Sequence, residues 1–460
     1  MSPLLTKSRR TELNCVTIGI ELPPVWRHVD LNHNYPLLKR TTIRRFSNAL
    51  RRAIFRFVKQ YTTHKPKHFH SLGRRAVVKA VWDVDAQLAE VSSSFDFLLL
   101  VTPVNTDAAW NQFRSSHFAR APDFHYLPTP MDPSLLKRRL YRVPVERVED
   151  PALHQIFRDK QLELDRKITM LRDRNTSSFL YGSLQLYGKV DDQLYKLALR
   201  ILDETPARSK VESKQGQLRA TDFARRAEAE IDYYRQLYPD FKAGVEVSSK
   251  AAGIMVSRGK LLLNKHLMTP ASRVDALLQH EVGTHLLTYF NGRSQPFRQL
   301  YSGLAGYDEL QEGLAVLSEY LVNGLSQPRM RQLAARVVSA KHLVDGADFI
   351  ETFRFLDRTH DFAQRAAFTI TMRIYRGGGL TKDAVYLRGL QQILKYLGDG
   401  GDIDPLFLGK MAADQIPVIR ELLFRKVLHP APLRPRYMTD PAALARLERV
   451  RQGLTVVDLL

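Results

Sequence analysis

The stretch "LLQHEVGTHLL", Leu277 to Leu287, places two histidines five residues apart, with a glutamate directly after the first. At about 100° per residue, positions five apart on an ideal α-helix are separated by about 140°, so the rings of His280 and His285 would not share a face. One inserted residue can be absorbed as a π-bulge, and such bulges are frequent at functional sites. Gly283 lies inside the interval and eases that distortion. We therefore predict a widened helical turn here.

The order His280, Glu281, His285 is that of the helix in zinc peptidases. In that motif the two histidines bind the metal and the glutamate takes a proton from water. A catalytic zinc site also needs a third protein ligand and an open position for water or substrate. The motif therefore predicts a third ligand elsewhere in the chain.

Candidates for this ligand lie in "YDELQEGLAVLSEYLVNG", residues 307–324. Glu312 and Glu319 are seven residues apart there, so on a helix they fall on one face, beside leucines that should be buried. Buried carboxylates generally need a partner such as a metal. Spacing alone does not separate these two glutamates, and either could be the third ligand.

A strand pair is predicted directly before the metal helix. The segment "GIMVSRGKLLLNK", residues 253–265, has two apolar runs that flank "SRG", which is typical of a β-hairpin with Gly259 at the turn. An edge strand beside a metal helix can hold substrate backbone by strand addition. Asn264, at the end of this strand, could contact that backbone or could simply cap the strand.

The composition indicates a globular protein, with 44% hydrophobic and 25% charged residues in a chain of 460. Its apolar runs are far shorter than the ~20 residues of a membrane-spanning helix, and the first residues lack the features of a secretory signal. Cys15 is the only cysteine, so no internal disulfide can form. These features favour a cytoplasmic protein, in which histidine and carboxylate rather than thiolate would hold a metal.

The positive charge is concentrated at the start of the chain. Residues 1–67 hold 14 Lys and Arg against 3 Asp and Glu, which is about half of the total net charge of +21. The stretch "RTTIRRFSNALRRAIFRFVKQ" alternates basic pairs with apolar residues and could contact an anionic surface, or could be a solvated basic helix. No nucleic-acid-binding motif accompanies it, so we expect no nucleic-acid partner.

The helical and polar patterns divide the chain into three parts. Residues 1–70 form a basic extension, residues 71–203 a mostly helical lobe with one or two strands, and residues 204–460 the lobe with the metal motif. The polar segment 204–217, "ETPARSKVESKQGQ", reads as a loop near the join.

Three motifs occur in order: "HEVGTH" at 280–285, "GLAGYDELQEGLAVLSEYL" at 303–321 and "RIYRGGGLTKDAVYLRGL" at 373–390. Together they resemble the flavohaemoglobin expression-modulating QEGLA-motif family, which is named after the residues that stand here at 311–315. The resemblance covers roughly residues 75 to 435. Relatives of that family include the animal tyrosine carboxypeptidase that acts on α-tubulin, a zinc enzyme with an H-E-x-x-x-H motif.

The resemblance implies a fold and a zinc site. His280 and His285 would bind Zn²⁺, and Glu281 would be the general base. Glu312, the glutamate of the QEGLA stretch, would be the third ligand, with Glu319 as the alternative. The implied fold is α+β and predominantly helical, with a zincin-like metallopeptidase core and an edge strand beside the metal helix.

The third motif offers groups that could bind substrate. A carboxypeptidase must bind a terminal carboxylate, and Arg373, Arg376 and Lys382 surround a three-glycine turn that lets backbone approach a ligand closely. Tyr386 could donate a hydrogen bond to an oxyanion. The same segment could instead be a Gly-rich turn before a structural helix, with its cations solvated.

Two residues at the start of the QEGLA segment could support the site from behind. Asp308 could accept a ring N–H from a ligand histidine, and Tyr307 stands next to it. Either residue could instead cap the helix that follows.

The sequence thus predicts a zinc-dependent peptidase that removes C-terminal residues from a peptide or protein tail. Tyrosine after an acidic tail is the substrate of the animal relatives, and a basic chain would suit such a tail. The alternative is a non-catalytic regulatory or binding protein that keeps the fold of the metal site. His280, Glu281, His285 and Glu312 are all present, which favours the enzyme.

Overall fold

The computed structural model describes residues 19–27, 35–63, 69, 79–148, 150–206, 216–249, 251 and 253–459. The chain divides into two compact units, Met1–Ala76 and Val77–Leu460. Cys15, the expected boundary at residue 70 and most of the expected loop at 204–217 lie outside the described residues. The expected join between residues 203 and 204 stays a prediction.

The smaller unit contains one long basic helix, α2 (Pro36–Tyr61), with proline in its first turn, no acidic residue in that turn and no buried residue. Ile43, Ile54, Phe57 and Tyr61 are exposed and, at helical spacing, share one face. The rings of Phe57 and Tyr61 lie 5.4 Å apart. The helix therefore presents an exposed apolar stripe among basic side chains.

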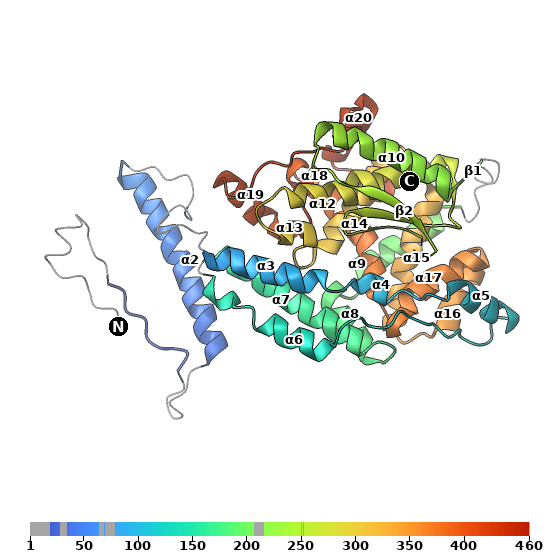
Figure 1. Ribbon diagram of the computed structural model, residues 1–460, viewed down its shortest axis with the longest axis horizontal. Coiled ribbons are helices and arrows are strands. Elements are labelled where there is room, and N and C mark those ends of the chain that lie inside the picture. Colours follow the sequence, from blue (N-terminus) through green and yellow to red (C-terminus); the bar gives the residue numbers. More distant parts are fainter. Residues whose placement is uncertain are drawn as a thin grey trace. The chain divides into compact units, whose positions relative to one another are not determined.

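The larger unit is predominantly helical with a small amount of strand, as the sequence predicted. The one or two strands expected in residues 71–203 are not found among the described residues of that range, where the apolar run at Phe97–Leu100 forms a short helix. Its first helices are α3 (Lys79–Ser93), α4 (Phe97–Leu100), α5 (Thr106–Ser115), α6 (Pro133–Tyr141), α7 (Pro151–Arg172), α8 (Ser178–Tyr187) and α9 (Asp192–Glu204). The later helices are α10 (Ala220–Leu237), α11 (Val274–His280), α12 (Leu287–Arg293), α13 (Gln299–Ser302), α14 (Tyr307–Leu321), α15 (Gln327–Val344), α16 (Phe349–Arg354), α17 (Gln364–Tyr375), α18 (Val385–Gly398), α19 (Ile416–Phe424) and α20 (Pro441–Arg451). Figure 1 shows α3, α6, α7 and α8 side by side, and among the later helices α11, α18 and α20 pack against α14. Among the described residues, none of the helices combines the length and the apolar character needed to cross a bilayer.

The strands form two small sheets. β1 (Gln217–Arg219) pairs antiparallel with β5 (Met268–Pro270). In the other sheet β4 (Lys260–Asn264) is central, parallel to β2 (Gly244–Ser248) and antiparallel to β3 (Ile254–Ser257). The predicted hairpin is therefore confirmed, and its turn residues Arg258 and Gly259 both have positive φ, 49° and 78°, as tight hairpin turns require. β3 lies at the edge of its sheet.

The predicted widening of the metal helix is confirmed. α11 continues into a π-helix, η5 (Glu281–Leu286), and then into α12. The hydroxyl of Thr284 donates to the carbonyl oxygen of Gln279, five residues earlier, at 3.0 Å. A Cβ on Gly283 would lie 2.3 Å from Oε1 of Gln279, so glycine leaves room for the Gln279 side chain in the widened turn.

The glycine of the QEGLA stretch lets two helices cross closely. A Cβ on Gly313 in α14 would lie 2.2 Å from the carbonyl carbon of Gly389 in α18, and a Cβ on Gly389 would lie 2.0 Å from the carbonyl oxygen of Glu309. Neither position has space for a side chain. α14 also packs on α11 and η5. The close crossing with α18 therefore helps to fix where Glu312 and Glu319 of α14 lie along the metal helix.

Candidate metal centre

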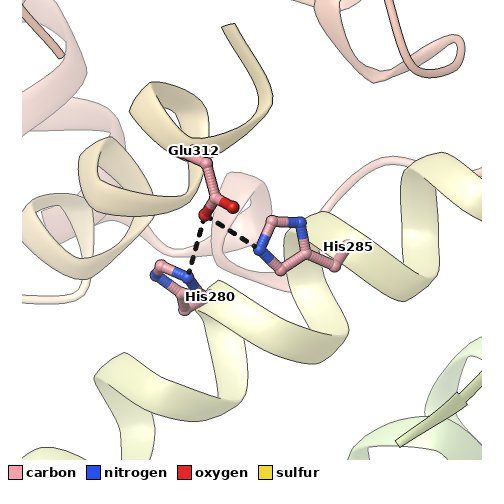
Figure 2. Close-up of side chains that lie close together, drawn as sticks. All are labelled: His280, His285 and Glu312. Atoms are coloured by element: carbon pink, nitrogen blue, oxygen red, sulfur yellow. Dashed lines mark ion pairs between the residues drawn. The ribbon is translucent and has the colours of Figure 1, made fainter. Parts of the chain in front are cut away.

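The widened turn brings the three predicted ligands together (Figure 2). Nε2 of His280 lies 3.8 Å from Oε2 of Glu312, and Nε2 of His285 lies 3.5 Å from the same oxygen. One ligand atom from each residue lies within 4.8 Å of the others. His280, His285 and Glu312 therefore form a group that could hold a metal ion.

The chemistry of these donors fits a divalent cation. Oε2 of Glu312 is buried and has no hydrogen-bond partner among the described residues. Burial alone would raise the pKa of this carboxyl, but the charges of Lys382, His285 and His280 outweigh it and hold the pKa well below its usual range. A charged carboxylate facing two imidazole nitrogens is a donor set that suits zinc and related ions.

Glu319 lies behind His280 and outside this group. Its Oε1 is 2.9 Å from Nδ1 of His280, which leaves Nε2 of that ring facing Glu312. The Glu319 carboxylate is completely buried and is also bound by Arg273 at 2.6 Å and Arg329 at 3.1 Å. Carboxylates in this position fix the orientation and tautomer of a ligand histidine. Glu312 and Glu319 of α14 therefore face different nitrogens of the His280 ring, Nε2 and Nδ1.

Glu281 is buried beside the group and its Oε2 has no hydrogen-bond partner among the described atoms. Burial raises the pKa of Glu281 to about 7, with the charge of His285 opposing the rise and those of Glu312 and Glu319 adding to it. A carboxyl with a pKa near neutrality is suited to accept and return a proton.

Asp308 was expected to accept the ring N–H of a ligand histidine, and this prediction is wrong. Glu319 makes that contact, with His280. Asp308 contacts Nζ of Lys382 at 3.2 Å instead of a ligand histidine. The same ammonium lies 3.1 Å from Oε1 of Glu312. Burial lowers the pKa of Lys382, but the two carboxylates outweigh it and hold the pKa well above the usual value. Lys382 is therefore engaged in holding Glu312, and in this arrangement its charge is not free for a substrate.

The arginines of the third motif form a cluster around one carboxylate. Asp383 accepts two bonds from Arg373, at 2.5 and 2.9 Å, and lies 3.5 Å from Nε of Arg336 and 3.9 Å from Nη2 of Arg376. One negative charge therefore faces three positive charges. The three-glycine turn at 377–379 has φ values of 69°, 108° and 119°, which glycine adopts without strain.

A cavity of about 310 Å³ joins these groups. It is lined by the three candidate ligands and Glu281, by residues 253–256 at and just before the edge strand β3, and by Arg373, Arg376 and Tyr386. The Tyr386 ring lies under the guanidinium of Arg336, 5.0 Å from its centre. The expected site residues Tyr307 and Asp308 also line this cavity.

Asn264 is not brought to the cavity. It stands at the end of the central strand β4, where its amide donates to the carbonyl oxygen of Ala251 at 2.5 Å and accepts from the backbone N–H of His266 at 2.8 Å. This side chain caps the strand, and β3 is the strand that lines the cavity.

Lys410 lines the cavity as well and was missed by the sequence reasoning. It stands in the short segment between two 3-10 helices, η9 (Asp404–Phe407) and η10 (Ala413–Gln415), far from every motif. A single lysine in such a segment gives no pattern from which its position could be predicted.

The chain from residue 111 to residue 454 matches the family model described as microtubule-associated tyrosine carboxypeptidase. No curated protein matches the chain at a significant level. Among solved structures, a lipoprotein of unknown function from Shewanella oneidensis has 13% sequence identity over 83% of this chain and 92% of that chain, with a TM-score of 0.38, which is too low to indicate a common fold. The family match spans most of the chain and confirms the resemblance carried by the three motifs. The chain belongs to the microtubule-associated tyrosine carboxypeptidase family.

Proposed function

We propose that this protein is a metal-dependent carboxypeptidase with zinc as the resident ion and a zincin-like arrangement of edge strand and metal helix. One observation carries the proposal: His280, His285 and Glu312 come together at a widened helical turn, and Glu281 lines the same cavity beside them. Membership of a carboxypeptidase family supports the same reaction.

The residues of the chain divide the work of hydrolysis among them. A divalent ion held by the three ligands would polarise the scissile carbonyl and acidify the attacking water. The open edge of β3 binds the substrate backbone by strand addition. Glu281 takes a proton from the water and passes it to the leaving amine. The hydroxyl of Tyr386 and the guanidinium of Arg373, which line the same cavity, donate hydrogen bonds to the oxyanion that develops on the scissile carbonyl.

Two of the predicted substrate contacts take more specific roles in this proposal. Arg376 donates to the hydroxyl of Thr102 at 2.9 Å and contributes its charge to the wall of the cavity. Lys382 orients Glu312 through the ion pair at 3.1 Å and acts on the substrate only through that ligand.

The substrate we propose is the C-terminal tyrosine of a protein tail. The family description names tyrosine as the residue removed, and the three guanidiniums around Asp383 leave an excess of positive charge beside the cavity. An acidic tail in the cytoplasm would be attracted by this excess and by the net charge of +21.

Hydrolysis and metal content test the proposal together. We expect the purified full chain to hold about one zinc ion and to release tyrosine from an acidic peptide ending in tyrosine, as measured by mass spectrometry. A chelator should lower the rate by about 100-fold or more, and added zinc should restore it. If no zinc binds even when it is supplied, and no peptide is cleaved, the chain is the non-catalytic binding protein that the sequence left as the alternative.

We further propose that α2 contacts an anionic membrane surface. Its exposed apolar stripe and surrounding cations are typical of helices that lie in the interface of a bilayer. The full chain should co-sediment with vesicles that contain anionic lipid, and the bound fraction should fall as salt is raised. A chain that lacks residues 1–70 should stay in solution. Equal binding of both chains to the vesicles would contradict this role for the helix.

A further inference from the structure

Lys410 lines the cavity of the metal centre, and two hydrogen bonds hold its backbone. Its backbone N–H donates to the carbonyl oxygen of Leu300 at 2.7 Å, and its carbonyl oxygen accepts from Leu304 at 2.9 Å. Its ammonium lies 5.6 Å from the ring centres of both Tyr289 and Tyr307. Burial lowers the pKa of Lys410 to about 8, although Asp308 and other carboxylates at longer range oppose the shift.

Two cavities meet at this lysine. The cavity of the metal centre shares six lining residues with a second cavity of about 250 Å³: Leu98, Met255, Val256, Tyr307, Asp308 and Lys410. The second cavity extends away from the metal group between α4, α7 and the hairpin. A substrate lying along β3 can therefore place the scissile bond over the metal group and one further residue in the second cavity.

The other buried and half-buried cations that border these cavities lie close to carboxylates. Lys160 and Lys167 share Glu163, at 2.6 and 2.9 Å. Lys382 contacts both Asp308 and Glu312, and the three guanidiniums of the arginine cluster share the one carboxylate of Asp383. Among the described residues, Lys410 has no carboxylate within 4.0 Å of its ammonium. Lys410 is half-buried, and a partly desolvated cation without a close counter-ion would be stabilised by an anion that a ligand brings.

We propose that the second cavity is the subsite for the terminal residue of the substrate and that Lys410 binds the α-carboxylate of that residue. The inference rests on the proposed carboxypeptidase activity and adds to it the group that recognises the chain end. An ammonium distinguishes a free terminal carboxylate from an internal peptide group by its charge. The aromatic walls, which include Tyr289, Tyr301 and Tyr307, fit a terminal residue with a large aromatic side chain.

Pairs of peptides that differ only in a C-terminal acid or amide test this subsite. In Lys410→Met, KM for the acid should rise by about 10- to 100-fold with kcat nearly unchanged, because one charge-assisted hydrogen bond is lost. KM for the amide should stay as in wild type, so the preference for the acid collapses. Lys410→Arg, which keeps the charge, should retain most of the preference.

The controls separate this site from its rivals. Lys395→Met removes a positive charge from an exposed pair with Asp399 and should leave both peptides unaffected. Arg373→Met removes a cation that lines the cavity of the metal centre but not the second cavity, and it should lower kcat for both peptides alike. If Arg373→Met abolishes the preference for the acid while Lys410→Met keeps it, the subsite is wrongly assigned.

Binding measurements separate the failure of this inference from the failure of the proposed activity. In the Glu281→Gln background, titration calorimetry should show tighter binding of the acid than of the amide, and Lys410→Met should remove the difference. If wild type cleaves neither peptide yet this difference in affinity is seen, the activity is wrong and the subsite stands. If wild type cleaves the acid and Lys410→Met keeps the full preference, the subsite is wrong and the activity stands. Thermal unfolding of each variant shows whether it is folded. If Lys410→Met does not fold, the acid-over-amide preference of Lys410→Arg is compared with that of wild type instead.

Discussion

Replacing Glu281 with glutamine should lower kcat for peptide hydrolysis by about 1,000-fold or more. Glutamine has the size of glutamate but cannot accept a proton from water at neutral pH. The native carboxylate, buried beside the three candidate ligands, can take the proton and return it. Steady-state release of tyrosine from an acidic peptide measures the effect.

Metal content provides the control for this variant. Glu281 is not one of the three ligands, so Glu281→Gln should bind as much zinc as wild type. Glu448→Gln, at an exposed position in α20 that pairs with Arg451 at 3.5 Å, should keep full activity. A Glu281→Gln enzyme with more than about a tenth of wild-type kcat would assign the proton transfer to another group.

The local shape of the metal helix could be predicted because its causes are local. The extra residue between His280 and His285 requires a wider turn, and Gly283 leaves room for the Gln279 side chain in that turn. The hairpin before it was equally readable, because Gly259 stands between two apolar runs. In both cases the residues that set the geometry are neighbours in the sequence.

Helical spacing alone could not decide between Glu312 and Glu319, for which the family resemblance was needed, because the choice depends on where another helix crosses α14. Seven residues are about two turns, so both side chains project from one face about 10 Å apart along the axis. His280 lies between these heights and offers one ring nitrogen to each glutamate. Lys410 escaped the sequence reasoning for the same reason, since only the folded chain brings it to the metal cavity.

The two glutamates of α14 should respond to substitution in different ways. Glu312→Ala removes a ligand, so zinc should be lost and tyrosine release should fall to the background rate. Glu319→Ala leaves the three ligands in place but removes the carboxylate that orients His280, so zinc affinity should fall by about 10- to 100-fold. Competition with a chromophoric chelator measures both affinities.

Stability of the metal-free protein distinguishes these roles most clearly. Glu319→Ala leaves Arg273 and Arg329 without their shared carboxylate in a buried position and should lower the free energy of unfolding by about 3–5 kcal/mol. Glu319→Gln should recover part of this loss, because the amide oxygen can still accept hydrogen bonds. Urea unfolding in the presence of a chelator measures the effect. If Glu319→Ala loses all zinc at unchanged stability while Glu312→Ala keeps its zinc, the two assignments must be exchanged, since a supporting carboxylate and a ligand cannot produce that pair of results together.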